Sequence, residues 1–216
     1  MKSIPVCTTA EPDLDLVVET LCRAFGDDPV VRWAIPYDAP DRRRWLGRFF
    51  EITTQMMFDL GGRVAHTPDH EGVLVWSGVL DTAAPPDEDD DSLEVLEQEC
   101  GPCGPRVATL MRMLDDHHPA GLPPHAHGLF FAIQPGERTL EVAYSLLCGA
   151  VDWLRDREVG WYAEASSPMA LEMWQMFGCH RVGEPIVLPE DGPPLFPIFW
   201  PASNVGAVFE QTAAAR

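Results

Sequence analysis

The stretch Gly128-Leu129-Phe130-Phe131-Ala132-Ile133-Gln134 decides the fold, because it is a continuous apolar run. A run of this length without alternation predicts a strand that is buried on both faces of a sheet. Residues 139–155 carry apolar side chains at helical spacing, and residues 160–165 and 168–177 predict another strand and another helix, with Gly178 as the helix stop. The sequence therefore predicts an α/β (α+β) chain with a sheet flanked by helices.

The preceding half of the chain predicts two long helices and a hairpin. A short strand is expected at residues 4–8, and helices at 12–25 and 40–60. The second helix has its apolar stripe at Trp45, Phe49, Ile52, Met56 and Leu60. Strands at 63–67 and 72–79 are joined by Pro68-Asp69-His70-Glu71, which predicts a hairpin.

A single domain is expected over residues 1–202, followed by a flexible tail at 203–216. Residues 79–124 are predicted to be an insertion, with an acidic, proline-bearing loop at 85–91 and short helices at 92–99 and 105–115. Strands at 181–188 and 196–200 complete the sheet. Neither a repeat nor a linker rich in small polar residues divides the chain.

Charge excludes two classes of partner. The chain has 15 Lys and Arg against 34 Asp and Glu, a formal net charge of −19. Nucleic acids and anionic membrane surfaces are held largely by Lys and Arg, so neither is expected as a partner. A cationic substrate such as an amine would be attracted, although plain solubility explains the charge equally well. No apolar run approaches a membrane span, and the first residues lack a signal-peptide pattern, so a cytoplasmic location is expected.

Four segments, in this order, resemble the GNAT acyltransferase superfamily. Ala24-Phe25-Gly26-Asp27-Asp28-Pro29 looks like its acceptor-side helix and loop, and Val73-Leu74-Val75-Trp76 like its third strand. Leu129-Phe130-Phe131-Ala132-Ile133-Gln134-Pro135 looks like its fourth strand, and Tyr162-Ala163-Glu164-Ala165-Ser166 like its fifth. The resemblance covers residues 4 to 200. It implies a mixed, mostly antiparallel sheet whose fourth and fifth strands splay apart.

The resemblance also implies a reaction, the transfer of an acyl group from a phosphopantetheine thioester to the amine of a small molecule. The pantetheine arm would lie between the splayed strands. Backbone N–H groups around Phe131, Ala132 and Ile133 would stabilise the oxyanion. Asp27, Asp28 and Trp33 lie in the acceptor-side segment, where the acidic pair is suited to hold a cationic acceptor; the alternative for the acidic pair is a helix-terminating turn.

The phosphate-binding turn departs from the family pattern. The aligned residues are Arg138-Thr139-Leu140-Glu141-Val142-Ala143. Arg138, Thr139 and Ala143 suit a site where a helix N-terminus holds the pyrophosphate of acetyl-CoA or another acyl-CoA. Glu141, however, stands where the family has glycine. A carboxylate about 4 Å from a phosphate charge costs about 4 kcal/mol at an effective dielectric constant near 20.

This departure favours a donor without the adenosine diphosphate part of CoA. An acyl chain on the phosphopantetheine of an acyl carrier protein is such a donor, and it would indicate secondary metabolism. A second departure is Trp174, which takes the place of the family's tyrosine acid; an indole N–H is not a usable acid at neutral pH. Both departures also suit the alternative hypothesis, a catalytically inactive GNAT-fold module with a binding or regulatory role.

The candidate bases are Glu164, His127 and His125. Glu164 lies on the predicted fifth strand, where donor and acceptor meet in the family, and the alternative is a structural hydrogen-bonding role. Each histidine precedes the predicted central strand and has a pKa suited to proton transfer near pH 7. The alternative for both is a loop histidine without a catalytic role.

Cys100-Gly101-Pro102-Cys103 spells a thiol–disulfide motif. The acidic helix before it would raise the thiol pKa rather than lower it, which argues against redox chemistry. The same cysteines with His117 or His118 and His125 or His127 give a zinc-like set, but the spacing is loose. No metal is therefore expected.

Overall fold

A computed structural model describes residues 4–80, 91–134, 136 and 139–207. The predicted acidic loop at 85–91 falls almost entirely outside these residues. The strands form a sheet in the order β1-β2-β3-β4-β5-β8-β6, with β7 paired to β8. Their bounds are β1 Cys7–Thr9, β2 Arg63–His66, β3 Gly72–Leu80, β4 His125–Ile133, β5 Gly160–Ala165, β6 His180–Arg181, β7 Ile186–Val187 and β8 Pro194–Trp200. Among the described strands, only β4 and β5 pair in parallel.

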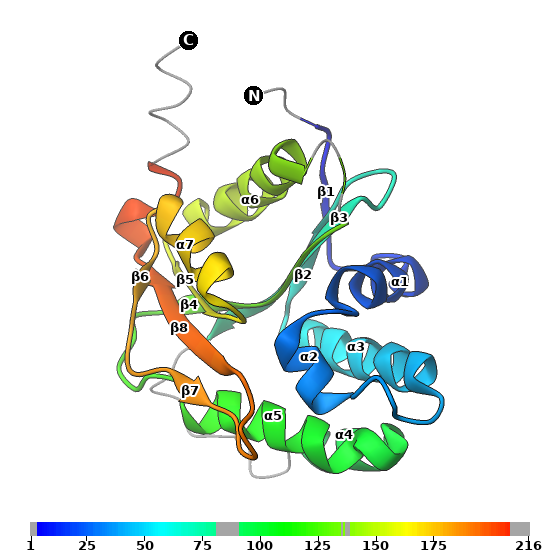
Figure 1. The fold of residues 1–216 in the computed structure, drawn as a ribbon. Coiled ribbons are helices and arrows are strands. Elements are labelled where there is room, and N and C mark those ends of the chain that lie inside the picture. Colours follow the sequence, from blue (N-terminus) through cyan, green and yellow to red (C-terminus); the bar gives the residue numbers. More distant parts are fainter. Residues whose placement is uncertain (1–3, 81–90, 135, 137–138, 208–216) are drawn as a thin grey trace.

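Helices cover both faces of this sheet (Figure 1). On one face lie α1 Leu14–Phe25, α2 Pro29–Ala34, α3 Arg42–Asp59, α4 Ser92–Glu99 and α5 Gly104–Asp116; on the other lie α6 Thr139–Arg155 and α7 Pro168–Met176. Successive β3 residues alternate between the two cores: Val73 and Val75 pack toward the first group, and Leu74 and Trp76 toward the second. The predicted α/β architecture is confirmed.

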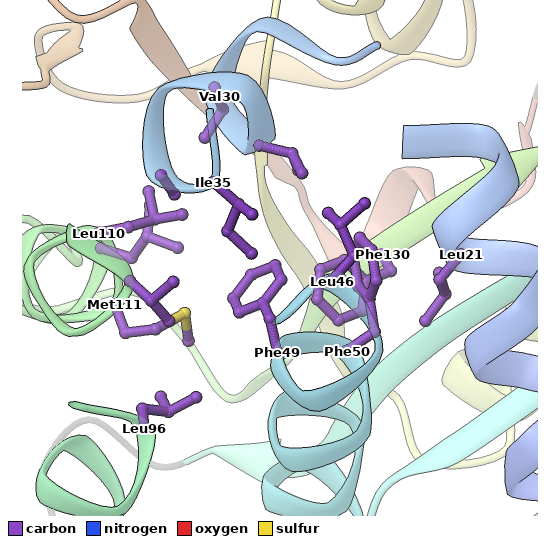
Figure 2. Close-up of a cluster of buried hydrophobic side chains, with 14 of the residues drawn as sticks. Leu21, Val30, Ile35, Leu46, Phe49, Phe50, Leu96, Leu110, Met111 and Phe130 are labelled. Carbon is purple, nitrogen blue, oxygen red and sulfur yellow. The ribbon is translucent and has the colours of Figure 1, made fainter. Parts of the chain in front are cut away.

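Phenylalanines dominate the core between α3 and the sheet (Figure 2). The Phe50 ring lies 5.0 Å from Phe49 and 5.2 Å from Phe130 of β4, measured between centroids. The buried face of α3 consists of Leu46, Phe49, Phe50, Thr53, Thr54 and Met57. The predicted stripe is confirmed at Phe49 and wrong at Leu60, which is exposed; Trp45, Ile52 and Met56 are partly buried and pack against the same core.

β4 and β5 separate partway along their length. The paired residues run from His125↔Gly160 to Gly128↔Ala163, and no later residue of β4 pairs with β5. β4 continues along β3 as far as Ile133, while β5 continues along β8 as far as Ala165. The predicted splay of these two strands is thus present.

A glycine is required where the strands diverge. A Cβ atom on Gly128 would lie 1.9 Å from Cζ2 of Trp161, a buried residue of β5. Contacts under 3.0 Å are essentially absent around real Cβ atoms, so only glycine lets the indole approach β4 this closely. The close approach of this ring therefore depends on Gly128.

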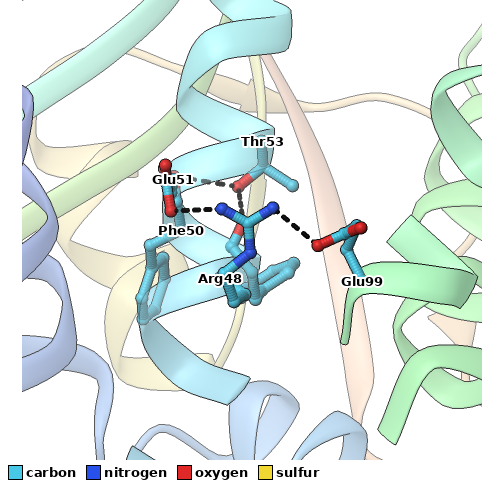
Figure 3. Close-up of polar contacts among 6 residues, drawn as sticks. Arg48, Phe50, Glu51, Thr53 and Glu99 are labelled. Atoms are coloured by element: carbon cyan, nitrogen blue, oxygen red, sulfur yellow. Dashed lines mark hydrogen bonds and ion pairs between the residues drawn. The ribbon is translucent and has the colours of Figure 1, made fainter. Parts of the chain in front are cut away.

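The α4–α5 segment, which lies within the predicted insertion, is fastened to α3. Arg48 of α3 donates to Glu51 at 2.7 Å and to Glu99 of α4 at 2.9 Å (Figure 3). Gly101, with φ +55°, lies beneath the Trp45 ring, where a Cβ would be 2.5 Å from Cη2. Only glycine adopts this conformation in this space without strain. The segment is thus part of the packed core.

Several boundaries differ from the prediction. β1 begins at Cys7 rather than at residue 4, and β4 begins at His125, so His125 and His127 are strand residues rather than loop residues. The single strand expected at 181–188 is divided into β6 and β7. Packing extends to Val205, which is buried and accepts a hydrogen bond from Arg155, three residues into the predicted tail. Residues 208–216 lie outside the described part.

Candidate functional site

A cavity of about 120 Å³ lies where β4 and β5 separate. Residues 128–131 of β4 and 163–166 at the end of β5 line it from both sides. Ala170, Met173 and Trp174 of α7 close one end, and side chains of α1, α3 and α5 line the other. Because helices from both faces of the sheet contribute, the cavity passes through the gap between the strands.

Glu164 places a carboxylate in this cavity wall. Its side chain is 3% exposed, and its Oε2 lies 2.8 Å from Nε2 of His127. Its Oε1 is buried and has no hydrogen bond of ordinary geometry among the described residues, although the Tyr162 hydroxyl lies beside the carboxylate and interacts with it. A buried carboxylate oxygen without a donor is costly, so this position suits an ammonium or N–H group of a ligand.

The Glu164 carboxylate changes the protonation of its neighbours. Burial disfavours the charged imidazole of His127, but the charge and hydrogen bond of Glu164 outweigh burial and raise the pKa of His127 above its ordinary value. The Tyr162 hydroxyl is buried beside the same carboxylate; burial, then the charge of Glu164 and the interaction of the hydroxyl with that carboxylate, raise the pKa of Tyr162. The Glu164 carboxylate therefore lies between His127, whose protonated form it stabilises, and the neutral hydroxyl of Tyr162.

His125 has hydrogen-bond partners other than the carboxylate. Its Nδ1 lies 2.8 Å from the carbonyl oxygen of Pro123, which can only accept, so Nδ1 carries the proton. Nε2 of neutral His125 then accepts a hydrogen bond from Nε2–H of His118 at 3.0 Å. Burial, followed by the neighbouring imidazoles His127 and His125, lowers the pKa of His118 to about 4. His118 and His125 thus form a neutral, stacked pair beside His127.

Of the predicted acceptor residues, Asp28 lines the cavity. Its Oδ1 accepts from the backbone N–H groups of Val30 and Val31 at 2.9 and 3.2 Å, which caps α2. Its Oδ2 accepts from Ser166 Oγ at 2.6 Å, which ties α2 to the end of β5. Burial raises the pKa of Asp28, and these hydrogen bonds oppose that shift.

Asp27 and Trp33 do not line this cavity. The Asp27 carboxylate is exposed and accepts from the Tyr37 hydroxyl. The indole N–H of Trp33 donates to the carbonyl of Pro189 at 3.0 Å, which joins α2 to the loop before β8. The structure therefore separates these two residues from the buried carboxylates.

The predicted donor-side residues lie on β4 and α7. Phe131 and Trp174 line the cavity, and their ring centroids are 5.4 Å apart. Ala132 and Ile133 lie beyond the point of separation and pair with β3 only. The backbone groups of β4 that face β5 there have no strand partner among the described residues, which leaves them free for an extended ligand.

The start of α6 carries the predicted phosphate-binding residues. Arg138 lies outside the described residues. Thr139 opens the helix and its hydroxyl donates to the carbonyl of Gly136 at 2.7 Å, while Ala143 is buried in the core. Glu141 occupies the first turn, where a carboxylate stabilises the helix dipole but repels an anion.

The cysteine pair is structural in this arrangement. Cys100 and Cys103 are both buried free thiols, and burial raises the pKa of Cys100 to about 12. A redox-active thiol needs the opposite shift. Within residues 4–80, 91–134, 136 and 139–207, no group of His, Cys, Asp and Glu is arranged to hold a metal ion. In the same residues, no helix is long and apolar enough to cross a membrane.

Sequence reasoning gave Tyr162 no role in the site and considered His118 only as a ligand in the zinc-like set. Tyr162 could have been found from the alternation of side chains along a strand. Tyr162 and Glu164 are two residues apart, so they share a face of β5. In the register, His127 stands opposite Tyr162. His118 belongs to the segment after α5, and nothing in its local sequence links it to β4.

Comparison with solved structures gives matches over nearly the whole chain. A protein from Corynebacterium glutamicum, described as histone acetyltransferase HPA2 and related acetyltransferase, is 22% identical over 93% of this chain and 97% of its own, with a TM-score of 0.61. Arylalkylamine N-acetyltransferase 2 from Aedes aegypti is 13% identical over 91% and 99%, with a TM-score of 0.60. PaiA N-acetyltransferase from Thermoplasma acidophilum in complex with coenzyme A is 8% identical over 92% and 99%, with a TM-score of 0.51.

No protein-family model matches the sequence, and no curated protein matches it. At identities this low, the likeness to solved structures concerns the fold alone.

Proposed function

The chain has the GNAT acetyltransferase fold, and from this premise we propose that it is an N-acyltransferase acting on a small-molecule amine. The donor is a phosphopantetheine thioester whose arm enters the gap between β4 and β5. The acceptor amine meets it from the side of α1, α3 and α5. Glu164, supported by His127, receives the amine and takes its proton.

The observation that carries this proposal is the unpartnered Oε1 of Glu164 in the cavity wall. An ammonium group there gains a charge-assisted hydrogen bond, and the same oxygen is placed to accept a proton. Oε2 is already held by His127, so the orientation of the carboxylate is fixed before the substrate arrives. The pair is thus suited to hold and deprotonate a cationic amine.

The reaction proceeds by attack of the neutral amine nitrogen on the thioester carbonyl carbon. One proton of the ammonium first passes to Glu164, and the nitrogen–carbon bond then forms. Backbone N–H groups of β4 around Phe131, Ala132 and Ile133 stabilise the negative charge on the carbonyl oxygen. The carbon–sulfur bond breaks, and the extra proton on the nitrogen passes to the thiolate directly or through water, because Trp174 has no acidic proton; Glu164 then releases its proton to solvent.

For the donor, we propose acyl-CoA or the acyl-phosphopantetheine of a carrier protein, with the carrier protein favoured. Support for CoA comes from the structural neighbour that holds coenzyme A, and Arg138, Thr139 and Ala143 would lie along its pyrophosphate. Glu141 in the first turn of α6 argues against tight pyrophosphate binding. Use of a carrier protein would place the enzyme in the cytoplasm, in secondary metabolism.

Activity with purified protein tests the proposal. Acetyl-CoA, acetyl-pantetheine and an acetylated carrier protein are each offered with a panel of primary amines, and amide product is measured by mass spectrometry. We expect amide formation with at least one donor, and a loss of about 10²–10⁴-fold in kcat/KM for Glu164→Gln. Glu184→Gln, at an exposed position, is the control and should leave the rate unchanged.

Two outcomes would contradict the proposal. Amide formation that is unaffected by Glu164→Gln would remove Glu164 from the chemistry. No product from any donor, together with no thermal shift on adding the donors, would favour the alternative of a catalytically inactive module.

A further inference from the structure

The acceptor end of the cavity is apolar. Leu110, Met111 and Leu114 of α5 line it opposite Phe25 of α1 and Phe49 of α3. Figure 2 shows Leu110 and Met111 pointing from α5 toward Phe49. A ligand body that fits between these side chains must be apolar, because it would bury any polar group away from water and without a partner.

The cavity offers one free position for a positive charge. Glu164 has an unpartnered oxygen, but both oxygens of Asp28 are already occupied by the N-cap of α2 and by Ser166. Burial also raises the pKa of Asp28, which favours its neutral acid, so Asp28 is a weaker counter-ion for a second ammonium than Glu164 is for the first. Although the net charge of −19 attracts polycations to the surface, the cavity itself favours a single cation, at Glu164.

The volume limits the size of the apolar body. The cavity measures about 120 Å³, and it must also hold the thioester end of the donor. In another protein, an apolar cavity of about 150 Å³ holds a benzene molecule. Because this cavity is smaller and is shared with the thioester, one ring is the upper limit for the apolar body of the acceptor.

From these three features we propose that the acceptor is a monoamine with an apolar body no larger than one ring, and that α5 sets this limit. The inference rests on the proposed function and deepens it. α5 comes from the segment between β3 and β4, and the Arg48–Glu99 and Gly101–Trp45 contacts hold that segment against α3. Met111 is thus a specificity-determining residue, which faces the ligand body rather than the reacting atoms.

Binding of amines without a donor tests the proposal separately from catalysis. Pentylamine and 1,5-diaminopentane have the same chain length and differ by one ammonium group. Titration calorimetry should give a dissociation constant for the monoamine at least 10-fold lower than for the diamine. Equal affinity, or a preference for the diamine, would overturn the proposal even if the protein transfers no acyl group.

Size selection is tested with benzylamine and 1-naphthylmethylamine. The wild type should prefer the one-ring amine, and Met111→Ala should shift the preference toward the two-ring amine by about 10-fold. Met113→Ala is the matched control, because Met113 lies on the same helix, packs in the core and does not line the cavity. An unchanged preference in a folded Met111→Ala protein would overturn the assignment of Met111. If Met111→Ala does not fold, the wild type alone tests the size limit. Equal affinity of the wild type for 1-naphthylmethylamine and benzylamine would overturn it.

Discussion

Removal of His127 should leave the buried Glu164 carboxylate without its cationic partner. The two side chains are 14% and 3% exposed, and their charged atoms are 2.8 Å apart. At an effective dielectric constant near 20, unit charges at that distance attract by about 6 kcal/mol, much of which offsets desolvation. Breaking one side of such a pair costs about 3–5 kcal/mol, so His127→Ala should lower the free energy of unfolding by that amount at pH 6.

A double-mutant cycle isolates the interaction. His127→Ala combined with Glu164→Gln removes the unpaired charge, and should be less destabilising than the sum of the single variants by about 2–3 kcal/mol. Urea unfolding at pH 6 and pH 9 gives the four free energies. His180→Ala, at an exposed position of β6, is the control and should change stability by less than about 0.5 kcal/mol.

The coupling has a defined pH dependence. Glu164 raises the pKa of His127 above the ordinary value of 6.5, so the folded state binds the proton more tightly than the unfolded state. The stabilisation is complete below pH 6.5 and is lost as the pH rises through the folded pKa. Single-variant effects that add to within about 0.5 kcal/mol, or a coupling that grows toward pH 9, would refute the buried ion pair.

Three further predictions concern the surroundings of the pair. Gly128→Ala should displace the Trp161 ring and destabilise the protein by about 1–3 kcal/mol in urea unfolding, whereas Gly47→Ala, which meets nothing within 4 Å in a helix, should stabilise it by about 0.5–1 kcal/mol. The pKa of His118 in the folded state is lowered to about 4, so the free energy of unfolding should fall as the pH drops from 6.5 toward 4. The urea midpoint of His118→Gln should fall less steeply with pH than that of the wild type. The same dependence of the midpoint on pH in both proteins would count against the buried neutral imidazole. Asp28→Ala should lower the free energy of unfolding by about 1–2 kcal/mol through loss of the α2 cap, and Asp28→Asn by less, as calorimetry can establish.

Much of the fold follows from local sequence. The bounds predicted for α6 and β5 match the structure, because an apolar helical stripe and a short apolar run are unambiguous signals there. β4 starts earlier than predicted because His125 and His127 interrupt the apolar run. They alternate with Ala126 and Gly128, so their side chains take one face of the strand while small residues take the other.

The site was predictable only in part. Glu164 and His127 were separate candidates, and their contact depends on the parallel register of β4 and β5, which no local pattern specifies. The hydrogen bond from Ser166 to Asp28 joins residues 138 positions apart. The hydrogen bonds that engage the Asp28 carboxylate therefore depend on the tertiary fold. The same holds for Glu164 being the carboxylate left to bind an ammonium group.

The burial of α5 is a second tertiary property. Its sequence predicts a helix, but whether the helix lies on the surface of an insertion or in the core depends on contacts with α3. Arg48 reaches Glu99 across that interface, and Gly101 lets the Trp45 ring lie over the turn. These contacts bring α5 to the acceptor end of the cavity.

The most direct test is a crystal structure of the protein with a ketone analogue of acetyl-pantetheine, in which a methylene group replaces the sulfur. We predict that the arm lies between β4 and β5 where they separate, with its carbonyl group between Glu164 and the backbone of β4. An arm bound elsewhere, with Phe131 and Trp174 still packed together across an empty gap, would contradict acyl transfer at this site.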